Sequence, residues 1–236
     1  MRIYSDCREL RSELMREVFE MGTHVHTGSY QNKVTEGDEQ FLTKEIINYS
    51  YCLKTLKEED YLFKGPGLSC KAWADAEFLE RVDKNPINPG EAWKLRRDVW
   101  EQFLDENGRF DYTYNQRLTA LLEIIELLKS KPNTRQAILA IWDADLDPMR
   151  TGGKKRVPCS VYYQFIIRGG KLSIIYNQRS CDVFTHFGND VYLAWKLMNY
   201  VAMETEKNIG YLYHNIASLH SYKRDWENLK KCIDEF

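Results

Sequence analysis

The chain has 236 residues, a hydrophobic fraction of 43% and a formal net charge of −2. The length predicts one domain over residues 1–236, and the apolar content excludes an intrinsically disordered chain. A net charge this close to zero excludes a strongly basic nucleic-acid-binding protein. We therefore expect no nucleic-acid partner, and we expect any anionic ligand to be held by a local cluster of donors.

The cysteines and the first residues indicate the compartment. Six cysteines are scattered without paired spacing, and the first ten residues, MRIYSDCREL, are charged from the second residue onward. No apolar run approaches the length of about 18 residues that a membrane span needs. The sequence therefore predicts free thiols, no secretory leader, no membrane partner and a cytoplasmic location.

The first half of the chain has the periodicity of helices. Apolar residues at helical spacing predict four helices, at 6–22, 41–60, 91–104 and 114–130. Polar, glycine and proline residues separate them and predict loops, the first of which could be a short hairpin, at 23–40, 63–70 and 83–90.

The second half is richer in β-branched and aromatic residues. They predict strands at 135–143, 159–180 and 210–219, and RGGK at 168–171 divides the second of these into a hairpin. Helical spacing returns at 190–208 and 221–236. Helices followed by strands with interleaved helices are typical of an α+β fold with one sheet rich in antiparallel pairs.

Cys159 stands at the start of an apolar strand, directly after Pro158. A nucleophilic thiolate needs a nearby cation, and the predicted hairpin returns Arg179 to the neighbourhood of Cys159. With its neighbours Gln178 and Ser180, Arg179 offers three kinds of donor to an oxyanion or a phosphate. Alternatively, the cysteine is a small buried hydrophobe and the arginine is a surface anchor.

These stretches resemble the thymidylate synthase family. VPCSVYYQFIIRGGKLSIIYNQRSCDVF resembles its Pro-Cys strand and the Gln-Arg-Ser-x-Asp strand that follows. Three further stretches resemble the family's tryptophan helix with its tyrosine, its arginine-led strand and its late His-x-Tyr: VWEQFLDENGRFDYTYN, NTRQAILAIW and ASLHSY. The resemblance covers most of residues 40–228. It implies a thymidylate synthase-like fold, a mixed and mostly antiparallel sheet packed with helices, whose open face forms a homodimer interface.

The resemblance also implies a reaction without a metal. A one-carbon unit passes from 5,10-methylenetetrahydrofolate to C5 of a pyrimidine nucleotide. Cys159 is implied as the nucleophile that adds to C6, and Tyr114 as the tyrosine near the reacting carbon. Glu45, expected on the helix at 41–60, matches a helical glutamate that organises water and moves protons. On residue type alone, Glu45 would be a solvated helix charge.

Binding roles follow from the same resemblance. At the 5′-phosphate it implies Arg179 and Ser180, beside the donor Gln178, and Arg135 reaching across the dimer. At the sugar 3′-hydroxyl it implies His220 and Tyr222. For the folate it implies Asp182 at the pterin and Trp100 as a packing ring.

Asp190 stands where thymidylate synthases carry an asparagine that pairs with uracil. An ionised carboxylate has no donor, so it suits the N4 amino group of cytosine and repels uracil O4. The pair Asn189–Asp190 and the run Ser218–Tyr222 resemble the phage deoxycytidylate hydroxymethylases of this family. This implies dCMP as substrate and 5-hydroxymethyl-dCMP as product, made for phage DNA modification in the host cytoplasm. Asp190 could instead cap the helix at 190–208.

Other positions depart from the family pattern. Ser160 replaces a histidine, Gln136 replaces a second phosphate arginine, and the N-terminal phosphate arginine is missing, for which Lys33 could substitute. The given sequence lacks the apolar tail that closes over folate, so we expect a site that admits water.

Three weaker motifs favour plain structural roles. His24 and His26 lack a third metal ligand, so they predict a polar loop. GGKKR at 152–156 could contact phosphates, but a solvated basic turn is the default expectation for it. Cys181 is expected to serve packing. The alternatives for the whole chain are a thymidylate synthase or hydroxymethylase acting on dUMP, a cytidylate methylase or CMP hydroxymethylase, and a catalytically silent binder of a nucleotide or RNA.

Overall fold

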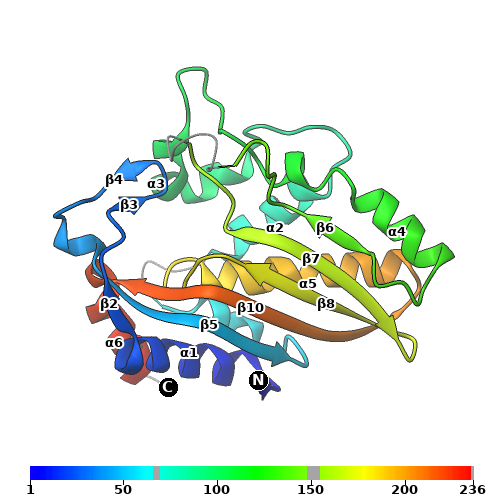
Figure 1. Cartoon of the computed structure of the whole chain (residues 1–236), viewed down its shortest axis with the longest axis horizontal. Coiled ribbons are helices and arrows are strands. Elements are labelled where there is room, and N and C mark those ends of the chain that lie inside the picture. The colour runs from blue at the N-terminus through cyan, green and yellow to red at the C-terminus, as the bar shows by residue number, and fades with distance from the viewer. Residues whose placement is uncertain (66–69, 148–154, 235–236) are drawn as a thin grey trace.

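A computed structural model of the chain describes residues 1–65, 70–147 and 155–234. Eight strands form one sheet, with the order β1-β5-β10-β8-β7-β6 and with β2 on β5 and β9 on β10 (Figure 1). The strands are β1 Arg2–Tyr4, β2 Thr23–Val25, β5 Thr43–Leu53, β6 Ile138–Ala140, β7 Ser160–Arg168, β8 Lys171–Gln178, β9 Cys181–Asp182 and β10 Asn208–Tyr222. A separate two-stranded hairpin joins β3 Ser29–Tyr30 to β4 Lys33–Val34.

Six α-helices lie within the described residues. They are α1 Cys7–Met21, α2 Lys71–Arg81, α3 Arg97–Trp100, α4 Leu121–Ser130, α5 Phe187–Glu204 and α6 Trp226–Asp234. The sheet is mixed, because β5–β10, β6–β7 and β7–β8 pair antiparallel while β8–β10 and β1–β5 pair parallel. The predicted α+β class is confirmed.

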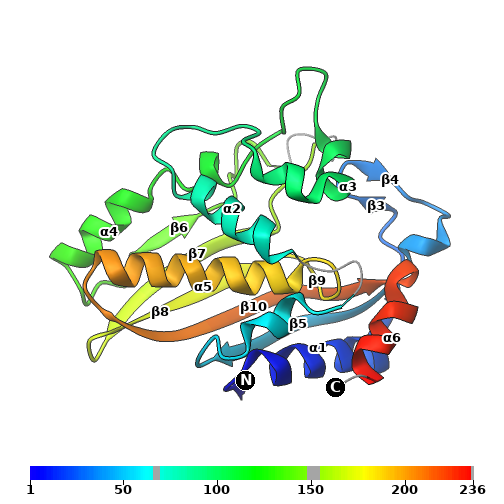
Figure 2. The same ribbon diagram turned by 180° about the vertical axis from the view of Figure 1, so that it is seen from behind.

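The helices gather on one face of the sheet, and Figure 2 shows α5 crossing directly over β8 and β10. Alternate residues of β8 therefore point into the core, and Leu172, Ile174 and Tyr176 are buried. The opposite face is the uncovered one in Figure 1, where Ile175 of β8 and its β10 partner Tyr213 are only half-buried.

The hairpin between β7 and β8 forms as the sequence predicts. Gly169 and Gly170 occupy its turn with φ of 56° and 74°, values that favour glycine and match a tight turn between twisted strands. The helix predicted at 6–22 is confirmed as α1, and those at 190–208 and 221–236 are confirmed in their main parts as α5 and α6. None of the helices in the described ranges is long and apolar enough to cross a membrane.

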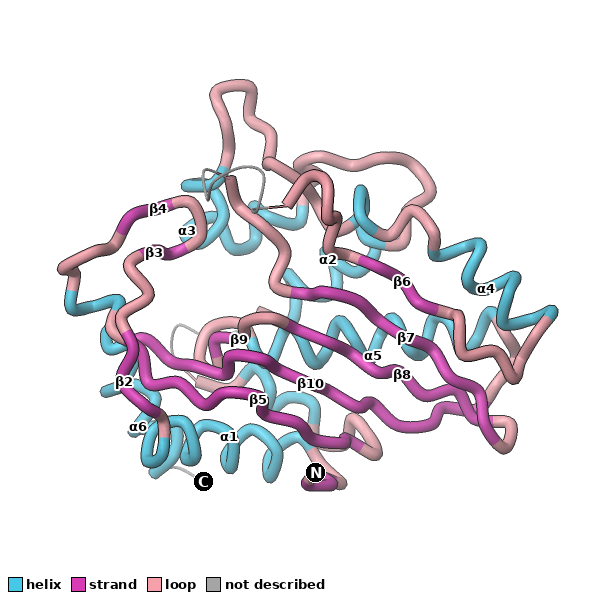
Figure 3. Tube along the Cα trace, in the orientation of Figure 1, coloured by secondary structure: helices cyan, strands magenta, loops and turns pink. Residues whose placement is uncertain are grey.

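The predicted helix at 41–60 is wrong. Residues 43–53 form β5, drawn as a strand in Figure 3, and β5 pairs along β10 from Leu53 opposite Leu212 to Thr43 opposite Tyr222. The segment TKEIINYSYCL is rich in β-branched and aromatic residues, whose fit to a pleated surface prevails over the local helical spacing. Glu45 therefore lies on a strand.

Two helical predictions need adjustment. The segment 91–104 is not one helix but the short α3 between 3₁₀ turns at Ala92–Arg96 and Glu101–Phe103. In the segment 114–130 a 3₁₀ turn comes first and α4 begins only at Leu121.

The sequence analysis missed α2, whose buried Trp73, Ala74 and Phe78 form one apolar stripe. Residues 66–69 of the predicted loop at 63–70 lie outside the described residues.

Candidate active site

A cavity of about 370 Å³ opens beside the ends of β7, β8 and β10. This size is typical of small-molecule sites. Ten of the predicted site residues line it: Cys159, Glu45, Tyr114, Asp190, Arg179, Ser180, Asp182, Trp100, His220 and Tyr222. They come from segments far apart in the sequence, and the sheet brings them together.

The candidate nucleophile lies against its predicted cation. The backbone N–H of Arg179 donates to the Cys159 carbonyl at 2.8 Å, and Arg179 Nη2 lies 4.0 Å from Cys159 Sγ. Burial raises the pKa of the Cys159 thiol, and the Arg179 charge opposes this effect. The amide of Gln31 also donates toward the sulfur at 4.0 Å. The surroundings of Cys159 therefore include charged and polar side chains as well as apolar ones.

Asp190 faces the same cavity from the first turn of α5. Its Oδ2 accepts a hydrogen bond from Gln178 Nε2 at 2.7 Å, and Cys181 Sγ lies 3.8 Å away. Burial raises the pKa of Asp190 to about 6, although the Gln178 hydrogen bond works in the opposite direction. The helix begins at Phe187 with His186 at its N-cap, so the interpretation of Asp190 as the cap is wrong.

Gln178 does not join the phosphate donors. Its side chain is 2% exposed and spans from Asp190 to His214 Nε2, which lies 2.9 Å from Gln178 Oε1. Strand alternation explains the difference, because Gln178 points to the helix-covered face. The expectation of a nucleotide-binding Gln178 is therefore corrected to a contact with Asp190.

Tyr114 and Ser160 meet across the cavity wall. Tyr114 Oη lies 3.2 Å from Ser160 Oγ, and Tyr176 Oη lies 2.8 Å from the same oxygen. The guanidinium of Arg81 stacks over the Tyr114 ring at 3.8 Å. These contacts fix the hydroxyl of Tyr114 near the candidate nucleophile.

Glu45 and His220 lie opposite each other on the paired strands β5 and β10. Ser218 Oγ donates to Glu45 Oε1, and His220 Nδ1 lies 3.4 Å from the Ser218 carbonyl oxygen. Burial lowers the pKa of His220, which favours a neutral imidazole. Glu45 thus lines the cavity, but from a strand and not from the expected helix.

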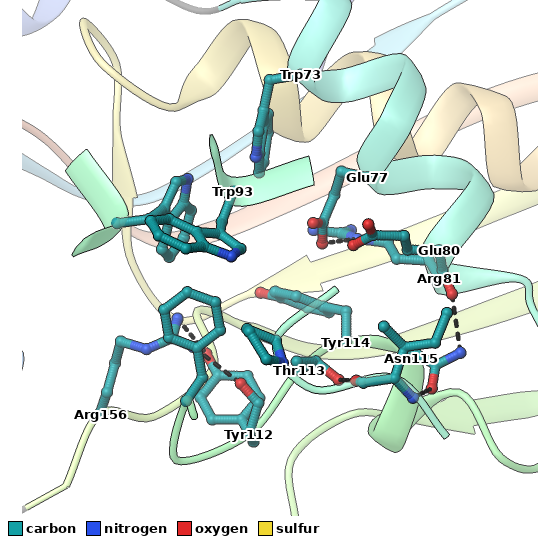
Figure 4. Close-up of a pocket in the computed structure, with 14 residues that line it drawn as sticks. Trp73, Glu77, Glu80, Arg81, Trp93, Tyr112, Thr113, Tyr114, Asn115 and Arg156 are labelled. Carbon is teal, nitrogen blue, oxygen red and sulfur yellow. Dashed lines mark hydrogen bonds and ion pairs between the residues drawn. The ribbon is translucent and has the colours of Figure 1, made fainter. Parts of the chain in front are cut away.

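A smaller cavity of about 40 Å³ shares walls with the first, among them Trp100, Tyr114 and Arg81. Figure 4 shows Tyr114 and Arg81 among the residues that line it. Glu77 reaches it from α2 and accepts a hydrogen bond from Arg81 Nε at 2.9 Å. Glu77 is therefore a helical glutamate beside Tyr114, and the sequence analysis missed it together with its helix. The glutamate and arginine one turn apart in KAWADAEFLER were the available signal.

Two residues predicted for folate line the larger cavity. Asp182 Oδ1 accepts hydrogen bonds from the N–H groups of Phe184 and Thr185 at 3.0 and 3.2 Å, which anchors the carboxylate. Trp100 stacks on Trp73 with ring centroids 5.8 Å apart. The buried indole N–H of Trp100 has no hydrogen-bond partner among the described residues.

Comparison with known proteins identifies the family of this fold and site. The family model described as "Thymidylate synthase" matches residues 88–235. The chain belongs to the thymidylate synthase family.

Similarity to individual proteins agrees with this assignment. A bifunctional dihydrofolate reductase-thymidylate synthase of Paramecium tetraurelia is 37% identical over 126 residues, which cover 52% of this chain and 26% of the relative. The chain thus matches only about a quarter of that relative's length. The structure of thermostable thymidylate synthase A from Bacillus subtilis superposes with a TM-score of 0.76 at 16% identity, covering 98% of this chain and 84% of that one. At this identity the likeness shows the thymidylate synthase fold.

Three basic residues of this thymidylate synthase family member lie in different places relative to the cavity. Arg135 is exposed and does not line this cavity. Lys33 is also exposed and donates to Gln102 Oε1, so it does not substitute for the missing arginine within this cavity. Arg156 lines the cavity instead. It is 7% exposed, stacks on the Tyr112 ring at 4.4 Å and donates to the Tyr112 carbonyl at 2.9 Å.

The interpretation of GGKKR as a solvated turn is therefore wrong for Arg156, because four aromatic rings enclose its guanidinium. Residues 152–154 of that motif lie outside the described residues. The packing role predicted for Cys181 is confirmed by its exposure of 1%. The six cysteines, all within the described ranges, are free thiols.

The two early histidines have structural contacts. The His24 ring stacks on Trp226, and His26 Nε2 lies 3.1 Å from the Asp38 carbonyl oxygen. Over residues 1–65, 70–147 and 155–234, we find no group of three or more histidine, cysteine or acidic side chains that could hold a metal.

Proposed function

We propose that this protein transfers a one-carbon unit from 5,10-methylenetetrahydrofolate to C5 of dCMP and releases 5-hydroxymethyl-dCMP. Membership of the thymidylate synthase family supports the one-carbon transfer. The observation that supports cytosine is the carboxylate of Asp190, which lines the same cavity as Cys159.

The reaction begins at Cys159. Its thiolate adds to C6 of the base, and the electron pair of the C5–C6 double bond moves so that C5 becomes the nucleophile. Arg179, 4.0 Å from the sulfur, stabilises the thiolate through its charge. The hydroxyl of Tyr114 is held by Ser160 on the same side of the cavity and is placed to act near the reacting carbon.

Asp190 selects the base. Gln178 directs its amide N–H at Asp190 Oδ2, and a carboxylate that receives a donor favours the ionised, accepting state. The cytosine N4 amino group and a protonated N3 can both donate to this carboxylate, whereas uracil O4 would face it with its own lone pairs. The penalty for uracil is an unsatisfied buried polar group.

Other residues hold the sugar and the phosphate. Arg179 and Ser180 contact the 5′-phosphate, and His220 and Tyr222 contact the 3′-hydroxyl. Arg135 serves the phosphate of a partner subunit, which its exposed position outside its own cavity allows. The homodimer forms through the uncovered sheet face, where half-buried apolar residues such as Ile175 and Tyr213 lie.

The folate co-substrate supplies the methylene carbon that C5 attacks. The ring of Trp100 packs on it, and the anchored carboxylate of Asp182 accepts from its pterin. Glu77 takes the water-organising and proton-moving role, because it stands on a helix beside Tyr114. Glu45, on its strand with Ser218, contributes to the same polar wall.

Water completes the reaction. Loss of the C5 proton supplies the electron pair that expels tetrahydrofolate and leaves an exocyclic methylene on C5. Water adds its oxygen to this methylene carbon and gives up a proton, which returns an electron pair to C5. That pair re-forms the C5–C6 double bond as the C6–sulfur bond breaks, and the thiolate of Cys159 is restored. The polar groups of Glu45, Ser218 and His220 along the cavity support a site that holds this water.

The second candidate is a thymidylate synthase acting on dUMP, favoured by the name of the Paramecium relative. A dUMP hydroxymethylase, a cytidylate C5-methylase and a CMP hydroxymethylase would use the same site. A nucleotide or RNA binder without catalysis would need no thiolate, so it would keep its function in Cys159→Ala. Production of modified cytosine for phage DNA in the host cytoplasm is the biological setting that we propose.

The test measures tritium release from C5-labelled dCMP and dUMP with methylenetetrahydrofolate, while dihydrofolate is followed by absorbance. Release from dCMP without dihydrofolate is the expected result. Release from dUMP with dihydrofolate would establish a thymidylate synthase and overturn the role of Asp190. No release from either nucleotide, with binding intact, would favour the silent binder.

A further inference from the structure

A row of buried side chains continues behind Asp190, on the helix-covered face of the sheet. Tyr51 of β5 is paired with His214 of β10, and His214 is paired with Tyr176 of β8. Tyr51 and His214 are both 0% exposed, and Gln178 follows two residues after Tyr176 on the same face. Tyr51, His214 and Gln178 do not line the cavity, so their role cannot be contact with a substrate.

Three hydrogen bonds join this row to Asp190. Tyr51 Oη lies 2.9 Å from His214 Nδ1, and His214 Nε2 lies 2.9 Å from Gln178 Oε1. Gln178 Nε2 lies 2.7 Å from Asp190 Oδ2. The chain of contacts therefore runs across three neighbouring strands and ends at the carboxylate in the cavity.

The donor and acceptor properties of these groups fix the direction of each of the three hydrogen bonds. An ionised Asp190 only accepts, so Gln178 must turn its NH₂ toward Asp190 and its oxygen toward His214. That oxygen also only accepts, so His214 must donate through Nε2–H. His214 Nδ1 then carries a lone pair, which accepts from the hydroxyl of Tyr51.

The imidazole of His214 is held in place for this role. It stacks on Tyr176 with centroids 4.4 Å apart and an interplanar angle of 13°, and Tyr51 meets it edge-on at 5.3 Å. Burial lowers the pKa of His214 to about 3, so the ring is neutral and has one donor and one acceptor. The ring can therefore neither turn freely nor offer two donors.

We propose that Tyr51 and His214 are positioning residues that fix the orientation of the Gln178 amide and thereby keep Asp190 an acceptor for the base. The proposal rests on the proposed function, because it assigns the source of the cytosine preference. Arg81, Arg96 and the Cys181 thiol also act on Asp190. The two arginines act through charge, which does not depend on the orientation of the amide, and therefore cannot replace this control.

A substitution at Tyr51, which contacts no substrate, is therefore expected to change the selection of the base. In Tyr51→Phe, His214 Nδ1 loses its donor, and the imidazole proton can move to Nδ1. His214 Nε2 then accepts, Gln178 turns its NH₂ toward it, and the amide oxygen of Gln178 faces Asp190. Asp190 then favours its protonated, donating state, which suits the O4 of uracil.

The experiment has two readouts on the full chain. The first is the tautomer of His214 in the wild-type protein, read from its imidazole nitrogen shifts after assignment with His214→Gln. We expect the proton on Nε2, and a proton on Nδ1 would overturn the proposal. This readout needs no activity, and the His214→Gln variant serves only to assign the signals.

The second readout is the ratio of the dissociation constants for dUMP and dCMP, measured by calorimetry without folate. Loss of one buried hydrogen bond to a charged group changes affinity by about tenfold, so we expect the ratio to fall by about tenfold in Tyr51→Phe and His214→Leu. His214→Gln restores a donor near the Nε2 position, so its ratio should remain within about threefold of the wild-type value.

The matched control is Tyr163→Phe. Tyr163 belongs to the same stack, with its ring 4.6 Å from Tyr176, but its hydroxyl contacts Ser160 and not this chain. In Tyr163→Phe the ratio of the dissociation constants for dUMP and dCMP should stay at the wild-type value. An unchanged ratio in a folded Tyr51→Phe protein, or an equal change in Tyr163→Phe, would refute the proposal.

The two proposals can fail separately. Wild-type protein that binds dUMP more tightly than dCMP would refute cytosine as the preferred base. A ratio that still moves in Tyr51→Phe, with the Nε2 tautomer present, would nevertheless support Tyr51 and His214 as residues that tune Asp190.

Discussion

Arg179 Nη2 lies 4.0 Å from the sulfur of Cys159, and the backbone N–H of Arg179 donates to the Cys159 carbonyl at 2.8 Å. The register of β7 and β8 holds the two residues together, so the cation is placed before any ligand binds. Burial works against the thiolate, and the guanidinium opposes it. The reactivity of Cys159 should therefore depend on this arginine.

Arg179→Gln should make the Cys159 thiol less reactive. Removal of the positive charge raises the pKa of Cys159 further, so the thiolate fraction near neutral pH falls and alkylation by iodoacetamide slows by about tenfold. The Cys70→Ser background removes a second, partly exposed thiol and leaves a hydroxyl at the N-cap of α2. Mass spectrometry of the Cys159 peptide over a pH series measures the shift. Equal alkylation profiles with and without Arg179 would contradict this role.

Asp190→Asn should exchange the preferred base. The amide supplies a donor for uracil O4 and loses one acceptor for the cytosine amino group. With two hydrogen bonds affected, the ratio of kcat/KM for dCMP to that for dUMP should fall by about a hundredfold. Tritium release from the two labelled nucleotides measures it. A proportional loss with both nucleotides would mean that Asp190 does not select the base.

Asp190 should also leave a signature in stability against pH. Its folded-state pKa is about 6, raised by burial, against an unfolded value of about 3.9. Between these values the folded state binds more protons, so its contribution to the free energy of unfolding falls as the pH rises from 4 to 6. Asp190→Asn should therefore match wild type near pH 4 and exceed its stability above pH 6 by about 1–3 kcal/mol.

Urea unfolding of both proteins at several pH values between 4 and 7.5 measures this difference. The buried histidines His186 and His214 are present in both proteins, so their own pH dependence cancels. A stability difference that is constant over this range would show that the carboxyl titrates at its unfolded-state value.

Glu77 and Glu45 can be distinguished by matched substitutions. Glu77→Gln keeps an oxygen for Arg81 Nε but removes the proton-transfer group, so tritium release should fall by about a hundredfold or more. Glu45→Gln keeps an acceptor for Ser218 and should lose less than about tenfold. Thermal melts of both variants check that the fold is intact. If Glu45→Gln lost more activity than Glu77→Gln, the proton-transfer role would belong to Glu45.

The sequence by itself determined the centre of the site. VPCSVYYQFIIRGGKLSIIYNQRS specifies two strands and a glycine turn, and antiparallel pairing across so short a loop places Arg179 beside Cys159. The carboxylate of Asp190 likewise predicts a base preference from its side-chain chemistry alone, and this preference stays a prediction. The first inference depends on local strand geometry, which a short stretch of sequence encodes, and the second depends on the chemistry of one side chain.

The tertiary structure decided the other features of the site, because they depend on contacts with residues distant in the chain. Residues 43–53 became a strand through pairing with β10, which moved Glu45 off a helix and left Glu77 of α2 as the helical glutamate. The face of β8 turned Gln178 away from the phosphate donors and toward Asp190 and His214. Periodicity within one segment cannot determine such contacts, since burial and strand pairing with remote segments select among the conformations that local spacing allows.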